Sequence, residues 1–72
     1  MTREDIINRF TYHAPFGDQL KRYEELRRTA RDYALMIDDL VPPCREKSLA
    51  LTKLEQAVMY ANAGIARNEK KS

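Results

Sequence analysis

Leu40-Val41-Pro42-Pro43-Cys44 lies between two long helical patterns in a chain of 72 residues, and this stretch decides the fold. Proline has no backbone N–H to donate, and the residue before a proline is driven out of helical geometry. A helix therefore ends near Val41, and the next helix begins close by, at Pro43 or Cys44. Two helices joined by so short a turn pack antiparallel, so the sequence predicts a helical hairpin.

On each side of this turn, apolar residues recur at spacings of three and four, which is the period of an amphipathic helix. Asp18 is a residue type that caps helix N-termini, so the pattern before the turn begins there. We expect helices over about 18–41 and 44–68, followed by a frayed tail over 69–72. The residues that carry the two patterns are Leu20, Tyr23, Leu26, Ala30, Tyr33, Ile37 and Leu40, then Leu51, Leu54, Val58, Ala61 and Ile65.

The N-terminal segment predicts a third, shorter helix over about 2–10. Thr2 and Asp5 form a weak capping-box pattern, and apolar residues follow on one side. The next segment, Thr11–Gly17, is called the connector below. It contains β-branched, aromatic and breaker residues, which favour an ordered, extended conformation. We expect one all-α domain over residues 1–72, with the short helix folded across the hairpin.

The size of the chain predicts self-association. At 72 residues, a single hydrophobic core contributes only a few kcal/mol of stability, so extra support is expected. The single cysteine, Cys44, excludes an internal disulfide, and the single histidine, His13, argues against a structural metal. A homo-oligomer remains. A stripe of small residues offers a face where another helix could approach closely, although these residues could instead let the hairpin itself pack tightly. The stripe contains Ala50, Ala57, Ala61 and Gly64.

Composition and charge argue against several classes of protein. The net charge is +2, from 13 basic and 11 acidic residues, which fits a small anionic ligand better than duplex nucleic acid. The longest apolar run, Tyr33–Ile37, is far shorter than the roughly 20 residues of a membrane span. The charged segment Thr2–Asp5 is unlike a signal peptide, and a single cysteine fits a reducing cytosol. We expect a soluble, cytoplasmic protein that binds neither membrane nor duplex nucleic acid.

Few residues could carry catalysis, so binding is favoured over enzymatic activity. Asp38 and Asp39 are neighbours on a helix and point about 100° apart, which indicates a solvated surface. Cys44 stands at a helix start, where thiols can become reactive, but a small capping or packing role is favoured. His13 has no second histidine or cysteine at ligand spacing. The sequence therefore predicts no catalytic residue, no metal and no cofactor.

Basic and aromatic side chains offer better binding chemistry. Five positive charges lie within eleven residues of the second predicted helix, and Arg27 and Arg31 border its apolar stripe. Guanidinium groups form charge-assisted hydrogen bonds to phosphate, and Arg67 offers another near the end of the last helix. Flat side chains suited to base stacking gather on or beside the connector. Periodicity alone favours the alternative, a solvated charged helix beside core aromatics. The two sets are Lys21, Arg22, Arg27, Arg28 and Arg31, and Phe10, Tyr12, His13 and Phe16.

Two groups of sequence stretches carry a resemblance to a known family. The first group is Arg9–Pro15 with Gly17–Gln19 and Arg22–Glu24, and the second is Val41–Pro43 with Arg45-Glu46, Leu54–Met59 and Ala61–Asn68. Both are similar to signatures of the phage anti-CBASS cyclic-oligonucleotide sponges. The resemblance implies compact helical subunits that assemble into hexamers. It implies that they sequester, without cleaving, the cyclic di- and trinucleotides made by bacterial CBASS immunity, in the cytoplasm of the infected host.

The resemblance also implies which residues bind each ligand. Tyr12 matches a connector tyrosine that stacks on a nucleobase, and Arg67 matches an arginine near the C-terminus that contacts phosphate. Arg27 falls where the family has a basic residue, and Thr29 falls where a threonine contributes to a separate trinucleotide pocket. We therefore expect a cyclic-dinucleotide site of Tyr12, His13, Arg27 and Arg67, and a cyclic-trinucleotide site of Thr29, Arg28 and Arg31.

Two positions depart from the family pattern. Cys44 stands where serine is expected and Gly64 where alanine is common, which bears on helix-start stability and local packing.

The main alternative is a small helical protein-interaction adaptor with a basic docking face, but an adaptor has no need of Tyr12 and His13 beside phosphate-binding arginines. A phosphodiesterase is disfavoured because the sequence lacks a set of metal ligands.

Overall fold

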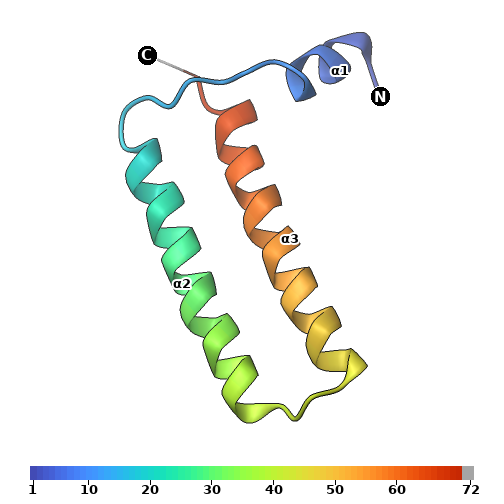
Figure 1. The fold of residues 1–72 in the computed structure, drawn as a ribbon. Coiled ribbons are helices and arrows are strands. Elements are labelled where there is room, and N and C mark those ends of the chain that lie inside the picture. The colour runs from blue at the N-terminus through green and yellow to red at the C-terminus, as the bar shows by residue number, and fades with distance from the viewer. Residues whose placement is uncertain (71–72) are drawn as a thin grey trace.

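The computed structural model describes residues 1–70, which form three helices and no strand (Figure 1). The helices are α1 (Arg3–Arg9), α2 (Gln19–Leu40) and α3 (Arg45–Asn68). Their ends differ from the predicted ranges by at most one residue. No helix in this part of the chain is long and apolar enough to cross a membrane. The all-α fold predicted from the sequence, a short helix followed by a long hairpin, is confirmed.

The turn between α2 and α3 has the structure that its two prolines impose. Val41 is extended, with φ −108° and ψ 129°, so α2 ends before the first proline. Cys44 is the N-cap of α3, and its Sγ accepts a hydrogen bond from the backbone N–H of Lys47 at 3.4 Å. The Lys47 Nζ lies 2.8 Å from the Asp38 carboxylate and 3.0 Å from the Asp38 carbonyl oxygen. These contacts close the turn and hold the two helices antiparallel.

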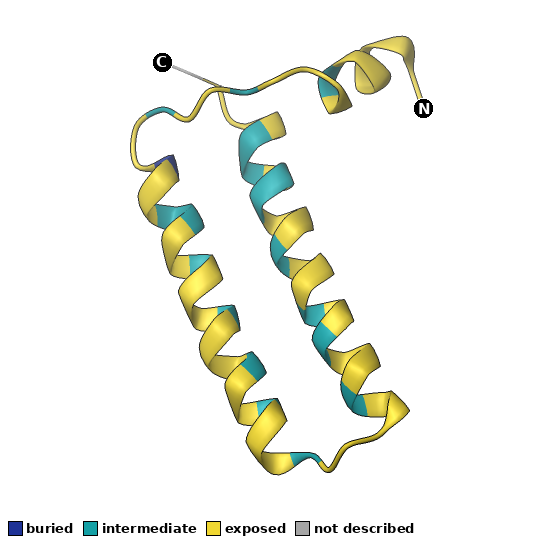
Figure 2. Cartoon of the chain, viewed as in Figure 1, coloured by how far each residue is buried: buried dark blue, intermediate teal, exposed yellow. Residues whose placement is uncertain are grey.

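The two long helices pack along one seam but do not enclose a core. Half-buried residues line the facing sides of α2 and α3, while their outer sides are exposed (Figure 2). No apolar side chain among the described residues is fully buried, and the principal extents of the chain are 45 × 28 × 12 Å. A single layer of two helices cannot cover both sides of its own apolar stripe. The residues of the seam are Leu26, Ala30, Ala34 and Ile37 on α2, and Leu51, Leu54, Val58 and Ile65 on α3.

The expectation that α1 folds across the hairpin is wrong. The capping box is present, because Thr2 and Asp5 exchange hydrogen bonds of 3.1 Å, but α1 lies beyond the open end of the hairpin (Figure 1). This helix has only seven residues and buries none of them. Ile6 and Ile7 are both exposed. So short a helix buries too little apolar surface to hold it against the seam, and polar contacts with the end of α3 position it instead.

The start of α2 and the tail also differ from expectation. Asp18 occupies the N-cap position, but its side chain caps no backbone N–H and instead accepts a hydrogen bond from Arg22 Nε at 3.1 Å. Gly17 precedes it with φ +58°, a left-handed conformation that glycine adopts without strain. The tail predicted to fray begins at Glu69, which is held by α2, as described below. Residues 71–72 lie outside the described part of the chain.

Candidate functional site

The connector crosses the open end of the hairpin and presents Tyr12 to solvent. The Tyr12 side chain is 84% exposed, and Phe10 beside it is also exposed. His13 is half-buried, with its ring Nε2 3.0 Å from the carbonyl oxygen of Asn8. Thr11 donates a hydrogen bond of 2.6 Å from Oγ1 to the Ile7 carbonyl oxygen. These contacts fix the backbone around Tyr12 and leave its ring open for stacking.

Arg67 lies in the last turn of α3 and contacts the segment just before the connector. Its Nη2 donates a hydrogen bond of 3.4 Å to the carbonyl oxygen of Arg9, and its own carbonyl oxygen accepts one of 3.2 Å from Asn8 Nδ2. The first of these is the one protein hydrogen bond that its guanidinium makes within residues 1–70, so further N–H donors remain for an anion. The fold therefore brings Arg67 into contact with Asn8 and Arg9, directly before the connector, although they are far apart in sequence.

A cluster of polar residues, which we call the clasp, joins the start of α2 to the end of α3. It consists of Gln19, Arg22 and Glu69. Arg22 Nη1 lies 2.7 Å from Glu69 Oε2 and Arg22 Nη2 lies 2.5 Å from Glu69 Oε1, a bidentate pair. Gln19 Nε2 donates to the same Oε1 at 3.0 Å, and Gln19 is only 2% exposed. The hydrogen bonds from Arg22 and then Gln19 lower the pKa of Glu69 to about 2.

Sequence reasoning misses the clasp because the sequence predicts a frayed tail over 69–72, which contains Glu69. One signal was present, since Gln19 and Arg22 both fall within the stretches that resemble the family. They lie three residues apart in the first turn of α2, so they share one side of the helix. Nothing in the sequence pairs that side with Glu69, which lies 47 positions after Arg22.

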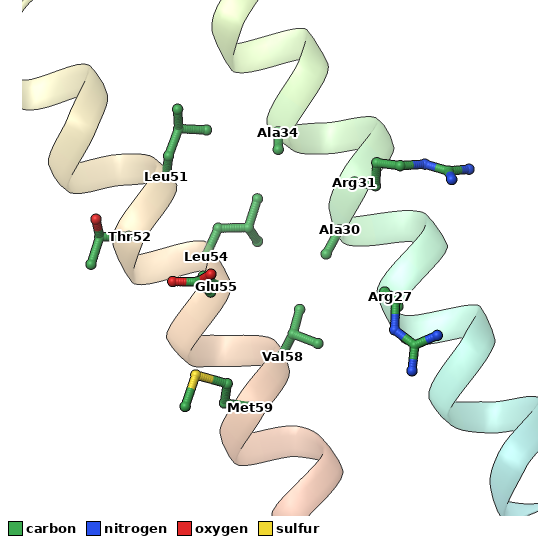
Figure 3. Close-up of a pocket in the computed structure, with 10 residues that line it drawn as sticks. All are labelled: Arg27, Ala30, Arg31, Ala34, Leu51, Thr52, Leu54, Glu55, Val58 and Met59. Atoms are coloured by element: carbon green, nitrogen blue, oxygen red, sulfur yellow. The ribbon is translucent and has the colours of Figure 1, made fainter.

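Arg27 and Arg31 lie on one side of the seam, beside a groove of about 500 Å³ that we call the basic groove (Figure 3). Both arginine side chains are exposed, and in Figure 3 Arg31 points away from α3. Arg27 Nη1 pairs with Glu24 at 3.0 Å, and Arg31 Nε lies 3.9 Å from Asp32. The floor between the helices is apolar. The groove is lined by Arg27, Ala30, Arg31, Ala34, Leu51, Thr52, Leu54, Glu55, Val58 and Met59.

Thr29 lines a different groove, on the other side of the seam, which we call the threonine groove. Its volume is about 280 Å³ and its other lining residues are almost all apolar. Thr29 and Arg31 are two positions apart, and each helical residue turns by about 100°, so they point to nearly opposite sides of α2. Arg28 is exposed on the outer side of the helix. The groove is lined by Leu26, Thr29, Ala30, Tyr33, Leu54, Ala57, Val58 and Ala61.

One chain therefore brings together only part of each predicted site. Tyr12, His13 and Arg67 gather at the open end of the hairpin. Arg27 lies about 12 Å farther along α2, counted from Gln19 at 1.5 Å per residue. In the predicted trinucleotide site, Arg28 and Arg31 are three positions apart and lie on neighbouring sides of α2, whereas Thr29 points about 100° away from Arg28 and about 160° away from Arg31. Within residues 1–70, no group of three or more histidine, cysteine or acidic residues could hold a metal ion.

The chain is a flat, all-helical hairpin with an exposed aromatic connector and with arginines beside an apolar groove. The sequence model of the Acb2/Tad1 hairpin domain matches residues 2–66. The chain belongs to this family, the anti-CBASS sponges, whose members bind rather than catalyse. No curated protein and no solved structure matches the chain. The matched range includes Tyr12, Arg27 and Thr29 and ends one residue before Arg67.

Proposed function

We propose that this protein captures cyclic di- and trinucleotide messengers without cleaving them, and so antagonises CBASS immunity in the cytoplasm of an infected bacterium. Membership of the anti-CBASS family supports the antagonism. A sponge works by mass action, so its dissociation constants must lie below the working concentration of the messenger. It must also be present in enough copies to hold the messenger that the host makes.

The contact between Arg67 and the segment before the connector is the observation that carries this proposal. Arg67 Nη2 lies 3.4 Å from the carbonyl oxygen of Arg9, three positions before Tyr12, whose ring is exposed. A cyclic dinucleotide presents flat bases and phosphates together, so a stacking ring beside a phosphate-binding guanidinium matches its chemistry. The ligand-binding residues proposed for it are Tyr12, His13, Arg27 and Arg67.

We also propose that the working form is a homo-oligomer, a hexamer by analogy with the family. The isolated chain exposes 6224 Å². A compact monomer of this mass would expose about 4,600 Å², so the hairpin has a large surface still to cover. Both grooves beside the seam are mainly apolar, and the members of each proposed ligand site are spread around one chain. Neighbouring subunits complete the sites, including the trinucleotide site of Thr29, Arg28 and Arg31.

Isothermal titration against cyclic di-AMP, cyclic di-GMP, cyclic GMP-AMP and cyclic tri-AMP tests the capture. We expect saturable binding of at least one member of the panel. Tyr60→Ala is a matched control for Tyr12→Ala, because Tyr60 is also exposed but lies on α3 outside both proposed sites. Absence of heat with every member would contradict the proposal. Light scattering tests the assembly, and a monodisperse monomer at micromolar concentration would contradict the oligomer.

A further inference from the structure

The clasp connects three parts of the chain that meet at the open end of the hairpin. Glu69 is the C-cap of α3, and it holds Arg22 and Gln19 in the first turn of α2. Gln19 continues the network, because its Oε1 accepts a hydrogen bond of 3.1 Å from the backbone N–H of Phe16 in the connector. The clasp therefore holds the C-terminal part of the connector against the end of α3.

A second set of contacts holds the chain just before the connector. Asn8 Nδ2 and the Arg9 carbonyl oxygen both bond to Arg67, two positions before Glu69. The connector is thus fixed on one side through Arg67 and on the other side through Glu69. Tyr12 lies between these two attachments.

Apolar packing contributes little to the position of Tyr12. Its ring is exposed, Phe10 is exposed, and α1 buries no side chain. Polar contacts are therefore the main restraint on where the Tyr12 ring stands relative to Arg67. Within the clasp, the buried amide of Gln19 is satisfied on both sides, by Phe16 and by Glu69. Breaking either hydrogen bond would leave a buried polar group unpaired, which costs free energy. Both bonds are therefore kept, and the network is held in one arrangement.

We propose that Glu69 is a positioning residue for cyclic-nucleotide capture, which sets the Tyr12 ring relative to Arg67 through the clasp. This inference rests on the proposed function, because the positioning matters only if Tyr12 stacks on the ligand. Arg22 then serves the connector and not the ligand, since its guanidinium is already occupied by the Glu69 carboxylate and by Asp18.

Glu69→Gln is the sharpest variant because it keeps the size of the side chain. Both carboxylate oxygens accept hydrogen bonds, so an amide at this position must turn an N–H₂ donor toward Arg22 or toward Gln19. Glu46→Gln is the matched control. It removes the same charge from an exposed glutamate in the first turn of α3, at the opposite end of the hairpin.

The experiment is a double-mutant cycle measured by titration with cyclic GMP-AMP, or with whichever cyclic dinucleotide the parent binds most tightly. Glu69→Gln should weaken binding by about twofold or more, which is the lower end of the effect seen between residues coupled in one network. In the Tyr12→Ala background the same substitution should cause no further loss, because the clasp acts through Tyr12. Glu46→Gln should bind like the parent. Amide hydrogen exchange of Phe16 should become faster in Glu69→Gln with no ligand present.

Several outcomes would overturn the inference. Binding equal to the parent, or an equal loss in both Tyr12 backgrounds, would give Glu69 no positioning role. Tighter binding would mean that Glu69 masks Arg22 as a ligand residue. If Glu69→Gln fails to assemble, Glu69→Asp takes its place, since the shorter carboxylate keeps its charge but cannot reach both partners. If the parent protein binds no cyclic nucleotide, the proposed function and this inference are both overturned. If the parent binds and Glu69→Gln binds equally well, only this inference is overturned.

Discussion

Asn8 donates a hydrogen bond of 3.2 Å from its Nδ2 to the backbone carbonyl oxygen of Arg67, across 59 positions of sequence. This bond joins the last turn of α1 to the last turn of α3 and places the N-terminal and C-terminal parts of the family signatures side by side. In the same region, the Arg67 guanidinium donates a hydrogen bond to the Arg9 carbonyl oxygen. The exposed Tyr12 ring and the Arg67 guanidinium therefore lie at the same end of the hairpin.

Tyr12→Ala should weaken cyclic-dinucleotide binding without changing the fold. Loss of a base-stacking face typically costs about 1–3 kcal/mol, which corresponds to a roughly five- to 150-fold weaker complex. The Tyr12 ring is exposed, so its removal leaves helix content and assembly unchanged. Titration, circular dichroism and light scattering check this, with Tyr60→Ala as the control. If both variants bind like the parent, Tyr12 has no stacking role.

Arg67→Ala should weaken binding by a similar order and should also reduce its dependence on salt. The reason is that one phosphate contact fewer leaves less electrostatic attraction to be screened. Titrations at low and high salt on Arg67→Ala and Tyr12→Ala should therefore give different signatures, since only the arginine variant loses charge. Arg67→Lys separates charge from geometry, because lysine keeps the charge but not the planar fork of donors. A salt dependence equal to that of the parent would exclude a phosphate contact at Arg67.

Thr29→Ala should weaken cyclic-trinucleotide capture and spare cyclic-dinucleotide capture. Thr29 lies in the threonine groove, on the opposite side of the seam from Arg27. Of these two grooves, Arg27 and Arg31 line only the basic groove and Thr29 lines only the threonine groove, so Thr29→Ala leaves the arginine side chains of the basic groove intact. Thr52→Ala, in the basic groove, is the matched control because it removes the same hydroxyl from the other side of the hairpin. Equal loss of both ligands in Thr29→Ala would refute separate sites.

The stability of the protein should fall in acid partly through Glu69. Its pKa is lowered from an ordinary 4.5 to about 2 in the folded chain, by Arg22 and then by Gln19. A lowered folded-state pKa means that the stabilising contribution is complete above about pH 4.5 and is lost as the pH falls through about 2. The backbone hydrogen bond with Thr2 holds the pKa of Asp5 below its usual value, so Asp5 acts in the same direction.

Urea unfolding followed from neutral to acidic pH measures this effect. Glu69→Gln should be less stable than the parent at neutral pH, and the difference between the two should shrink as the pH falls toward about 2. A difference that stays constant over the whole range would show that the carboxylate charge contributes nothing to the clasp.

The helices were predictable because local signals determine them. Pro42 and Pro43 end α2, and the three-four repeat through Leu51, Leu54 and Val58 defines the inner side of α3. The position of α1 was not predictable, because a seven-residue helix with exposed isoleucines has no apolar face that commits it to the hairpin. Its place depends on hydrogen bonds with Arg67, which leave no trace in hydrophobic periodicity.

The sequence predicts which residue types the candidate site contains, but not how these residues are arranged. A helical wheel places Arg27 and Arg31 beside the apolar stripe, and the structure puts both beside the basic groove. A helical wheel cannot show that Gln19 and Arg22 bind Glu69, because that pairing depends on how far α3 extends past the start of α2. Spacing on one helix also separates Thr29 from Arg31, so the trinucleotide site that we propose would need residues from more than one subunit.

Capture without cleavage is tested most directly by a recovery experiment. A cyclic dinucleotide that the protein binds is mixed with increasing amounts of protein, and the free nucleotide is measured after ultrafiltration. The protein is then denatured, and the released nucleotide is quantified by chromatography. We predict that free nucleotide falls in proportion to added protein and that all of it is recovered intact and cyclic after denaturation. Free nucleotide that does not fall, or linear products in the recovered fraction, would contradict a sponge.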